Sequence, residues 1–65
     1  MSYPYVVFAG YKQNYLEPQV AALDEETAIA EAKKLEDKYA CVEAVYMPED
    51  DLDVNEIVYS YYKED

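Results

Sequence analysis

Four segments of the chain have the residue pattern of β-strands. Residues 3–11, 40–47 and 54–62 are rich in β-branched and aromatic residues, which favour strands. Residues 19–23 form a weaker segment, because two alanines separate its larger apolar residues, and a loop is the alternative there. The single glycine, Gly10, falls near the end of the first segment, where it indicates a bulge or a close approach of another backbone segment.

Residues 25–39 have the spacing of an amphipathic helix. The residues of the predicted apolar face follow one another at intervals of four, three and four: Ala28, Ala32, Leu35 and Tyr39. Asp24 is a good N-cap, acidic residues fill the first turn, and lysines follow in the second half. The pattern therefore predicts a helix that begins directly after Asp24, although no glycine marks its end.

The order of these elements is β-β-α-β-β. It predicts a single α+β domain over residues 1–65, with one helix packed on one face of a mostly antiparallel sheet. The first and last strands carry apolar residues on both faces, which is typical of central strands. We therefore expect these two strands to lie side by side and parallel, an arrangement that resembles the ubiquitin-like and protein-G-like topology. A three-stranded β-α-β-β sheet is the competing prediction.

The second face of the sheet has no predicted cover. One helix of about 15 residues is long and wide enough for one face only, and nine of the 65 residues are Tyr. Tyrosine is enriched in binding surfaces because its ring buries area while its hydroxyl group stays hydrated. We predict a contact face that includes Tyr5, Tyr59 and Tyr61. The simpler alternative is that these residues are only good strand formers.

The composition excludes most enzyme chemistry. The chain has no His and no Arg, and its single cysteine is Cys41. Without an imidazole, no hydroxyl or thiol nucleophile has its usual activating partner. Without a guanidinium group, the chain lacks the planar fork that clamps phosphate or carboxylate. We therefore expect a protein that is not an enzyme and that uses no cofactor and no metal.

The charge narrows the class of partner. Fifteen acidic residues stand against five lysines, which gives a net charge of −10 and a pI near 4.1. This sign disfavours direct binding to nucleic acid and to anionic membranes. The N-terminus does not have a signal-peptide pattern, no apolar run has the length of a membrane span, and a lone cysteine forms no internal disulfide. We therefore expect a cytoplasmic protein.

An acidic segment follows the third predicted strand, with an acidic turn at residues 49–53. Its carboxylates are those of Glu49, Asp50, Asp51, Asp53 and Glu56. A calcium loop does not fit, because an acidic residue stands where the required glycine belongs and a tyrosine stands where the bidentate glutamate belongs. Two interpretations remain open: the turn only keeps the sheet soluble, or it mimics the charge of nucleic acid toward a basic protein.

The small size, the acidity, the many tyrosines and the lack of histidine resemble one group of proteins. These are the anti-CRISPR and anti-restriction proteins that phages and plasmids encode against host defence systems. The resemblance covers the whole chain and is one of size and charge rather than of motif. It implies a viral or plasmid inhibitor that acts in the host cytoplasm by binding a host defence or nucleic-acid-processing protein.

Taken together, these features predict a small acidic inhibitor that binds a host protein with a basic surface. The acidic segment would steer the encounter and the three tyrosines would supply contact area. The alternative is a non-catalytic accessory domain that forms a homodimer through its sheet faces. A third interpretation, a small ligand held between two copies, is disfavoured because Arg and His are both missing.

Overall fold

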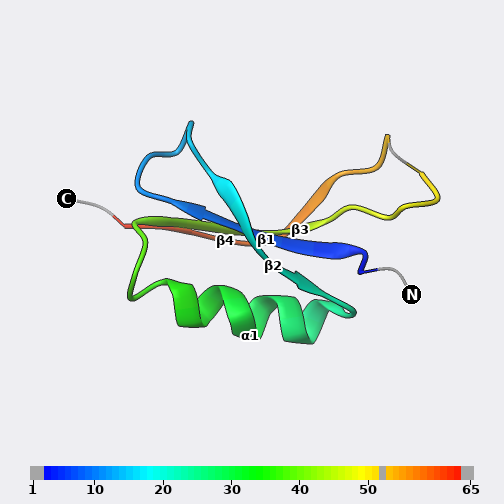
Figure 1. Ribbon diagram of the computed structural model, residues 1–65, viewed down its shortest axis with the longest axis horizontal. Coiled ribbons are helices and arrows are strands. Elements are labelled where there is room, and N and C mark those ends of the chain that lie inside the picture. Colours follow the sequence, from blue (N-terminus) through cyan, green and yellow to red (C-terminus); the bar gives the residue numbers. More distant parts are fainter. Residues whose placement is uncertain (1–2, 52, 64–65) are drawn as a thin grey trace.

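A computed structural model of the protein describes residues 3–51 and 53–63, so Leu52 in the predicted acidic turn lies outside the described residues. It shows a four-stranded sheet with one helix against one face (Figure 1). The elements in chain order are β1 (Tyr5–Gly10), β2 (Glu17–Ala22), α1 (Glu25–Leu35), β3 (Cys41–Tyr46) and β4 (Glu56–Tyr62). The predicted α+β class and element order are confirmed. The three-stranded alternative is wrong, because β2 pairs with β1.

The strand order differs from the predicted one. The sheet has the order β2-β1-β3-β4, and all neighbouring strands are antiparallel. The expectation that the first and last strands are parallel central neighbours is therefore wrong, since β3 takes the place beside β1 and β4 lies at an edge. The physical reason is residue size. Strand β3 consists mostly of small and β-branched residues that are buried on both faces, whereas the larger aromatic residues of β4 remain half-buried or exposed.

The helix begins where the sequence predicts and ends earlier. Its last residue is Leu35, four positions before the predicted end at Tyr39. The backbone N–H groups of Lys38 and Tyr39 both donate to the Leu35 carbonyl oxygen, at 3.0 and 2.9 Å. This tight turn brings the chain directly into β3 at Cys41.

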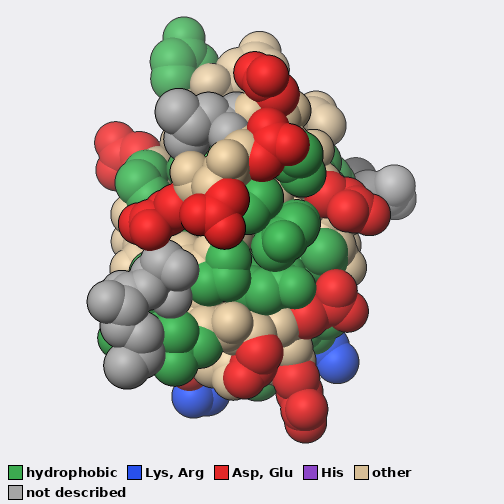
Figure 2. All heavy atoms as spheres, turned by 90° about the vertical axis from the view of Figure 1, so that its right-hand side faces the viewer, with side chains coloured by type: hydrophobic (Ala, Val, Ile, Leu, Met, Phe, Trp, Pro, Cys, Tyr) green, Lys and Arg blue, Asp and Glu red, His purple; other side chains and the backbone are tan. Residues whose placement is uncertain are grey.

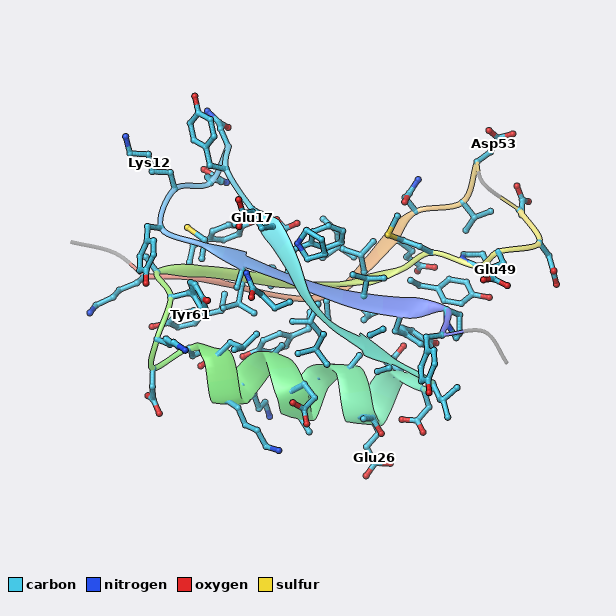
Figure 3. All side chains as sticks on the ribbon, in the orientation of Figure 1. Lys12, Glu17, Glu26, Glu49, Asp53 and Tyr61 are labelled. Carbon is cyan, nitrogen blue, oxygen red and sulfur yellow. The ribbon has the colours of Figure 1, made fainter. Side chains whose placement is uncertain are left out.

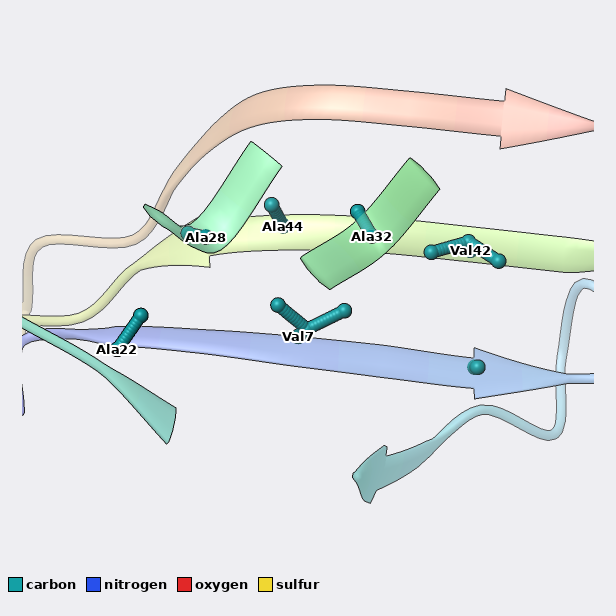
Figure 4. Close-up of a cluster of buried hydrophobic side chains, with 7 residues drawn as sticks. Val7, Ala22, Ala28, Ala32, Val42 and Ala44 are labelled. Carbon is teal, nitrogen blue, oxygen red and sulfur yellow. The ribbon is translucent and has the colours of Figure 1, made fainter. Parts of the chain in front are cut away.

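Small residues fill the core between helix and sheet. The core cluster contains Val7, Ala9, Ala22, Ala28, Ala32, Val42 and Ala44 (Figure 4). The two valines are the largest side chains that are fully buried. Larger side chains surround this cluster and are only partly buried: Tyr5, Val20, Leu35, Tyr39, Val58, Tyr59 and Tyr61. Four of the nine tyrosines therefore complete a core that is too small by itself.

Both edge strands carry a bulge at the middle of the sheet. In the pairing of β1 with β2, the register skips Gln19, and in the pairing of β3 with β4 it skips Val58. The two irregularities lie on either side of the paired central residues Val7 and Ala44. Bulges bend edge strands and make them poor templates for pairing with another chain.

The predicted close approach at Gly10 is confirmed. A Cβ atom at this position would overlap the backbone carbonyl oxygen of Tyr15, and the φ angle of Gly10 is not positive. The glycine is therefore required for space and not for its conformational freedom. It is paired regularly with Cys41, so the alternative of a bulge at Gly10 is wrong.

The alanine contact between helix and sheet leads to the first prediction. We expect Ala32→Leu to lower the free energy of unfolding by about 1–3 kcal/mol, because Ala32 is fully buried and a larger side chain must push the helix away from the sheet. Urea unfolding measures this change. The matched control is Ala30→Leu on the exposed side of the same helix, which we expect to change stability by less than about 0.5 kcal/mol. Equal losses in both variants would contradict the tight contact.

Candidate functional site

The structure collects carboxylates at one end of the molecule. Figure 3 places Glu26, Glu49 and Asp53 there, where the helix begins and the β3–β4 connection lies. We call this the acidic end, and its residues, all exposed, are Asp24, Glu25, Glu26, Glu49, Asp50, Asp51, Asp53 and Glu56. The predicted acidic segment is thus joined by three acidic residues from the start of the helix.

The lysines lie toward the opposite end. Lys12 belongs to the β1–β2 connection, and Lys33 and Lys34 belong to the last turn of the helix (Figure 3). Lys38 lies between the helix and β3, and Lys63 directly follows β4. The long dimension of the molecule is 38 Å, whereas charges in physiological salt are screened over about 8 Å. The acidic end therefore presents its own negative field, which the lysines do little to weaken.

Two tyrosines with neighbouring, tilted rings lie among these acidic residues. Tyr5 and Tyr46 are paired across β1 and β3, both are half-buried, and their ring centroids are 5.0 Å apart. Exposed Leu23 directly follows β2, and exposed Met47 directly follows β3. Figure 2 views this end and shows an apolar patch surrounded by Asp and Glu side chains.

The environment of Tyr5 shows how close the acidic residues are. Partial burial, followed by the negative charges of Glu25, Asp24 and Glu56 together with the neighbouring Tyr46, raises the pKa of Tyr5 above its ordinary value. The hydroxyl group therefore stays protonated at neutral pH and is available as a hydrogen-bond donor. Thus the structure brings the predicted contact residue Tyr5 together with the predicted acidic segment.

The other two predicted contact tyrosines lie elsewhere. Tyr59 and Tyr61 pack against the core on the face that the helix covers, as Tyr5 does, so the predicted place of all three on an uncovered face is wrong. Their partners across the strand pair are Ala44 and Val42, whose side chains belong to the core. The Tyr59 hydroxyl donates to the carboxylate of Glu36, and this hydrogen bond is the main cause of a raised pKa of Tyr59. The alternation of residues along β4 divides its side chains into two sets, but it does not show which set faces the helix.

Among the described residues no helix covers the face of the sheet away from α1, although Val45 and Cys41 of β3 are buried there. Strand alternation and the pairing register place on this open face Val6, Phe8, Val45, Ile57 and Tyr62. Ile57 is 56% exposed, and the Tyr62 hydroxyl donates to the Glu43 carboxylate across the strands. Both hairpin connections bend away from the helix, toward this side (Figure 1).

In the part of the chain that the structure describes, no three or more His, Cys, Asp or Glu side chains converge as metal ligands. Helix α1, the one helix of residues 3–51 and 53–63, lacks the length and the apolar character needed to cross a bilayer. Cys41 is a buried free thiol.

No family model, curated protein or solved structure matches this chain.

The cap at the start of the helix leads to a prediction about pH. The Thr27 backbone N–H donates to the Asp24 carboxylate at 2.7 Å, and this hydrogen bond holds the pKa of Asp24 below its ordinary value. A carboxylate with a lowered pKa in the folded state stabilises the fold above its unfolded pKa, and this contribution is lost as the pH falls through the folded pKa. We expect Asp24→Ala to be less stable than the wild type at pH 7, with a smaller difference at pH 2.

The matched control is Asp24→Asn, since asparagine also caps helices but does not titrate. Urea unfolding at pH 7, 4 and 2 should show a steeper acid loss for the wild type than for Asp24→Asn. Parallel stability curves for these two proteins would show that Asp24 does not act through its charge.

Proposed function

We propose that this chain is a small non-catalytic inhibitor that binds a cationic surface of another protein through its acidic end. The observation that carries the proposal is the placement of eight exposed carboxylates at the end of the molecule that also holds the half-buried Tyr5–Tyr46 pair. The same end shows an apolar patch surrounded by Asp and Glu side chains (Figure 2). Interfaces between proteins commonly combine an apolar centre with a polar rim.

The acidic rim suits a cationic partner for two reasons. Exposed carboxylates attract such a partner over a distance and orient it before contact. In addition, no lysine lies at this end to weaken the attraction, because the described lysines are collected toward the other end. After the encounter, the rings of Tyr5 and Tyr46 and the exposed side chains of Leu23 and Met47 supply apolar contact area.

A nucleic-acid-processing or defence protein is the proposed class of partner. Such proteins hold a phosphate backbone in a positively charged groove, and duplex DNA carries about one negative charge per 1.7 Å of its axis. A compact group of carboxylates competes for the same groove. The resemblance of this chain to phage and plasmid anti-defence proteins supports an action in the host cytoplasm, in competition with nucleic acid.

The acidic end is tested with charge-removing variants. The chain is first used to capture proteins from a bacterial lysate at low salt, and the association rate with a captured nucleic-acid-binding protein is then measured. We expect Asp50→Asn with Asp53→Asn to slow association by about tenfold, because steering depends on exposed charge. Asp51 is left unchanged because its carboxylate accepts a hydrogen bond from the Asp53 backbone N–H, at 3.2 Å, within the turn.

The matched control removes two acidic charges far from the acidic end, by Glu17→Gln with Asp37→Asn. We expect this control to associate at nearly the wild-type rate. Added nucleic acid should displace the wild-type chain from its partner. The proposal fails if both double variants slow association equally, if nucleic acid does not compete, or if no nucleic-acid-handling protein is captured.

A second candidate function follows from the open face. An uncovered apolar surface is suited to pack against a second copy, which would make the chain a homodimeric accessory domain. The net charge of −10 opposes this association, because each copy repels the other.

The homodimer has its own test. It predicts that the light-scattering mass rises with added salt toward twice 7.5 kDa, the mass of two chains. It also predicts that Phe8→Ser, which removes a half-buried ring from the open face, keeps the mass of a single chain. A wild-type mass of 7.5 kDa at all salt concentrations would rule this candidate out.

A further inference from the structure

A cavity lies beside the β1–β2 connection, toward the end of the molecule away from the acidic end. Its volume is about 440 Å³ and it is open to solvent. The side chains that define its chemistry are those of Tyr11, Lys12, Tyr15, Glu17, Gln19 and Tyr39. Figure 3 shows Lys12 and Glu17 on the two sides of this hairpin connection. The cavity takes no part in the proposed inhibitory contact.

The walls of the cavity are held in place by specific contacts. The Tyr15 backbone N–H donates to the Lys12 carbonyl oxygen at 3.0 Å, and the lack of a side chain at Gly10 lets the Tyr15 carbonyl group lie against β1. The ring of Tyr39, from the segment after the helix, packs against the ring of Tyr11 at a centroid distance of 5.3 Å. Two chain segments remote in sequence therefore form one site before any ligand arrives.

Two of the three tyrosines at this site, Tyr11 and Tyr15, differ from those that complete the core. Tyr15 is 73% exposed and Tyr11 is 69% exposed. Neither belongs to the partly buried set packed against the core, so the core does not account for them. Exposed aromatic rings that line a concave site are typical of ligand binding, because they offer a large apolar surface with little loss of conformational freedom.

The polar groups of the cavity indicate the class of ligand. Lys12 and Glu17 carry opposite charges, and the Gln19 side-chain amide both donates and accepts hydrogen bonds. This lining has no net charge although the chain carries −10. It matches a neutral ligand with many hydroxyl groups, each of which also donates and accepts. The negative face of a tyrosine ring attracts the partly positive C–H groups on the flat side of a sugar ring.

We propose that this cavity binds a neutral saccharide, with the ring stacked on Tyr11 or Tyr39 and its hydroxyl groups bonded to Lys12, Glu17 and Gln19. The volume lies within the range of about 300–1,000 Å³ that small-molecule sites occupy, and an open cavity of this size accommodates roughly one or two sugar rings. A phosphate would face the Glu17 carboxylate, and a guanidinium group would face the Lys12 ammonium, so both charged alternatives meet a like charge.

The test uses the full chain labelled with ¹⁵N and a set of free sugars: glucose, galactose, N-acetylglucosamine, maltose and cellobiose. Each is titrated to about 50 mM, which detects dissociation constants near 1 mM, equivalent to about −4.1 kcal/mol. We expect at least one sugar to shift the backbone amide signals of residues 10–17, Gln19 and Tyr39 and to leave the acidic end unchanged. We expect Tyr11→Ala and Gln19→Ala each to weaken this binding by about tenfold.

The matched control is Tyr3→Ala, which removes another exposed tyrosine, 51% exposed and outside the cavity, and should bind as the wild type does. Arginine amide and inorganic phosphate serve as charged probes. The proposal is overturned if no sugar shifts these signals, or if either charged probe saturates the site while the sugars do not. It is also overturned if well-folded Gln19→Ala and Tyr11→Ala variants bind sugar with wild-type affinity.

Discussion

The close contact of helix α1 with strands β1 and β3 is the constraint on which the rest of the structure depends. The helix presents Ala28 and Ala32 to a sheet surface made of Val7, Val42 and Ala44, and all five side chains are fully buried. Such a contact excludes water but buries little apolar area for each residue. Partly buried tyrosine rings at its margin supply the missing area and keep their hydroxyl groups near water. The high tyrosine content is therefore first a consequence of the small core.

The direction of the helix also determines where the charges lie. Acidic residues occupy its first turn and lysines its last, as the helix dipole favours. Because β3 begins after the helix and runs back along it, the β3–β4 connection returns to the start of the helix (Figure 1). The acidic segment of that connection thus joins the acidic first turn. A local preference within one helix, combined with the chain topology, yields a molecule with one strongly negative end.

Features that depend on local residue preferences could be predicted from the sequence, whereas features that depend on the chain topology could not. The helix start followed from the Asp24 cap, and the strands followed from their alternating and β-branched residues. The strand order could not be predicted. Apolar residues on both faces of β4 indicated a central strand, whereas β4 and its tyrosines lie at an edge of the sheet. The Tyr5–Tyr46 pair depends on β1 and β3 being neighbours, so it could not be predicted without the correct strand order. The acidic segment was recognised, but its joining with the start of the helix required the topology.

Charge distinguishes the binding places that we propose for this molecule. Association of two copies through the open face must overcome the repulsion between two chains of charge −10, whereas a cationic partner at the acidic end gains from the same charge. The cavity near Lys12 lies toward the other end of a 38 Å molecule, well beyond the screening length of about 8 Å. Its neutral lining is therefore insensitive to the state of the acidic end. For this reason the proposed binding of a neutral small ligand does not compete with the proposed binding of a basic protein.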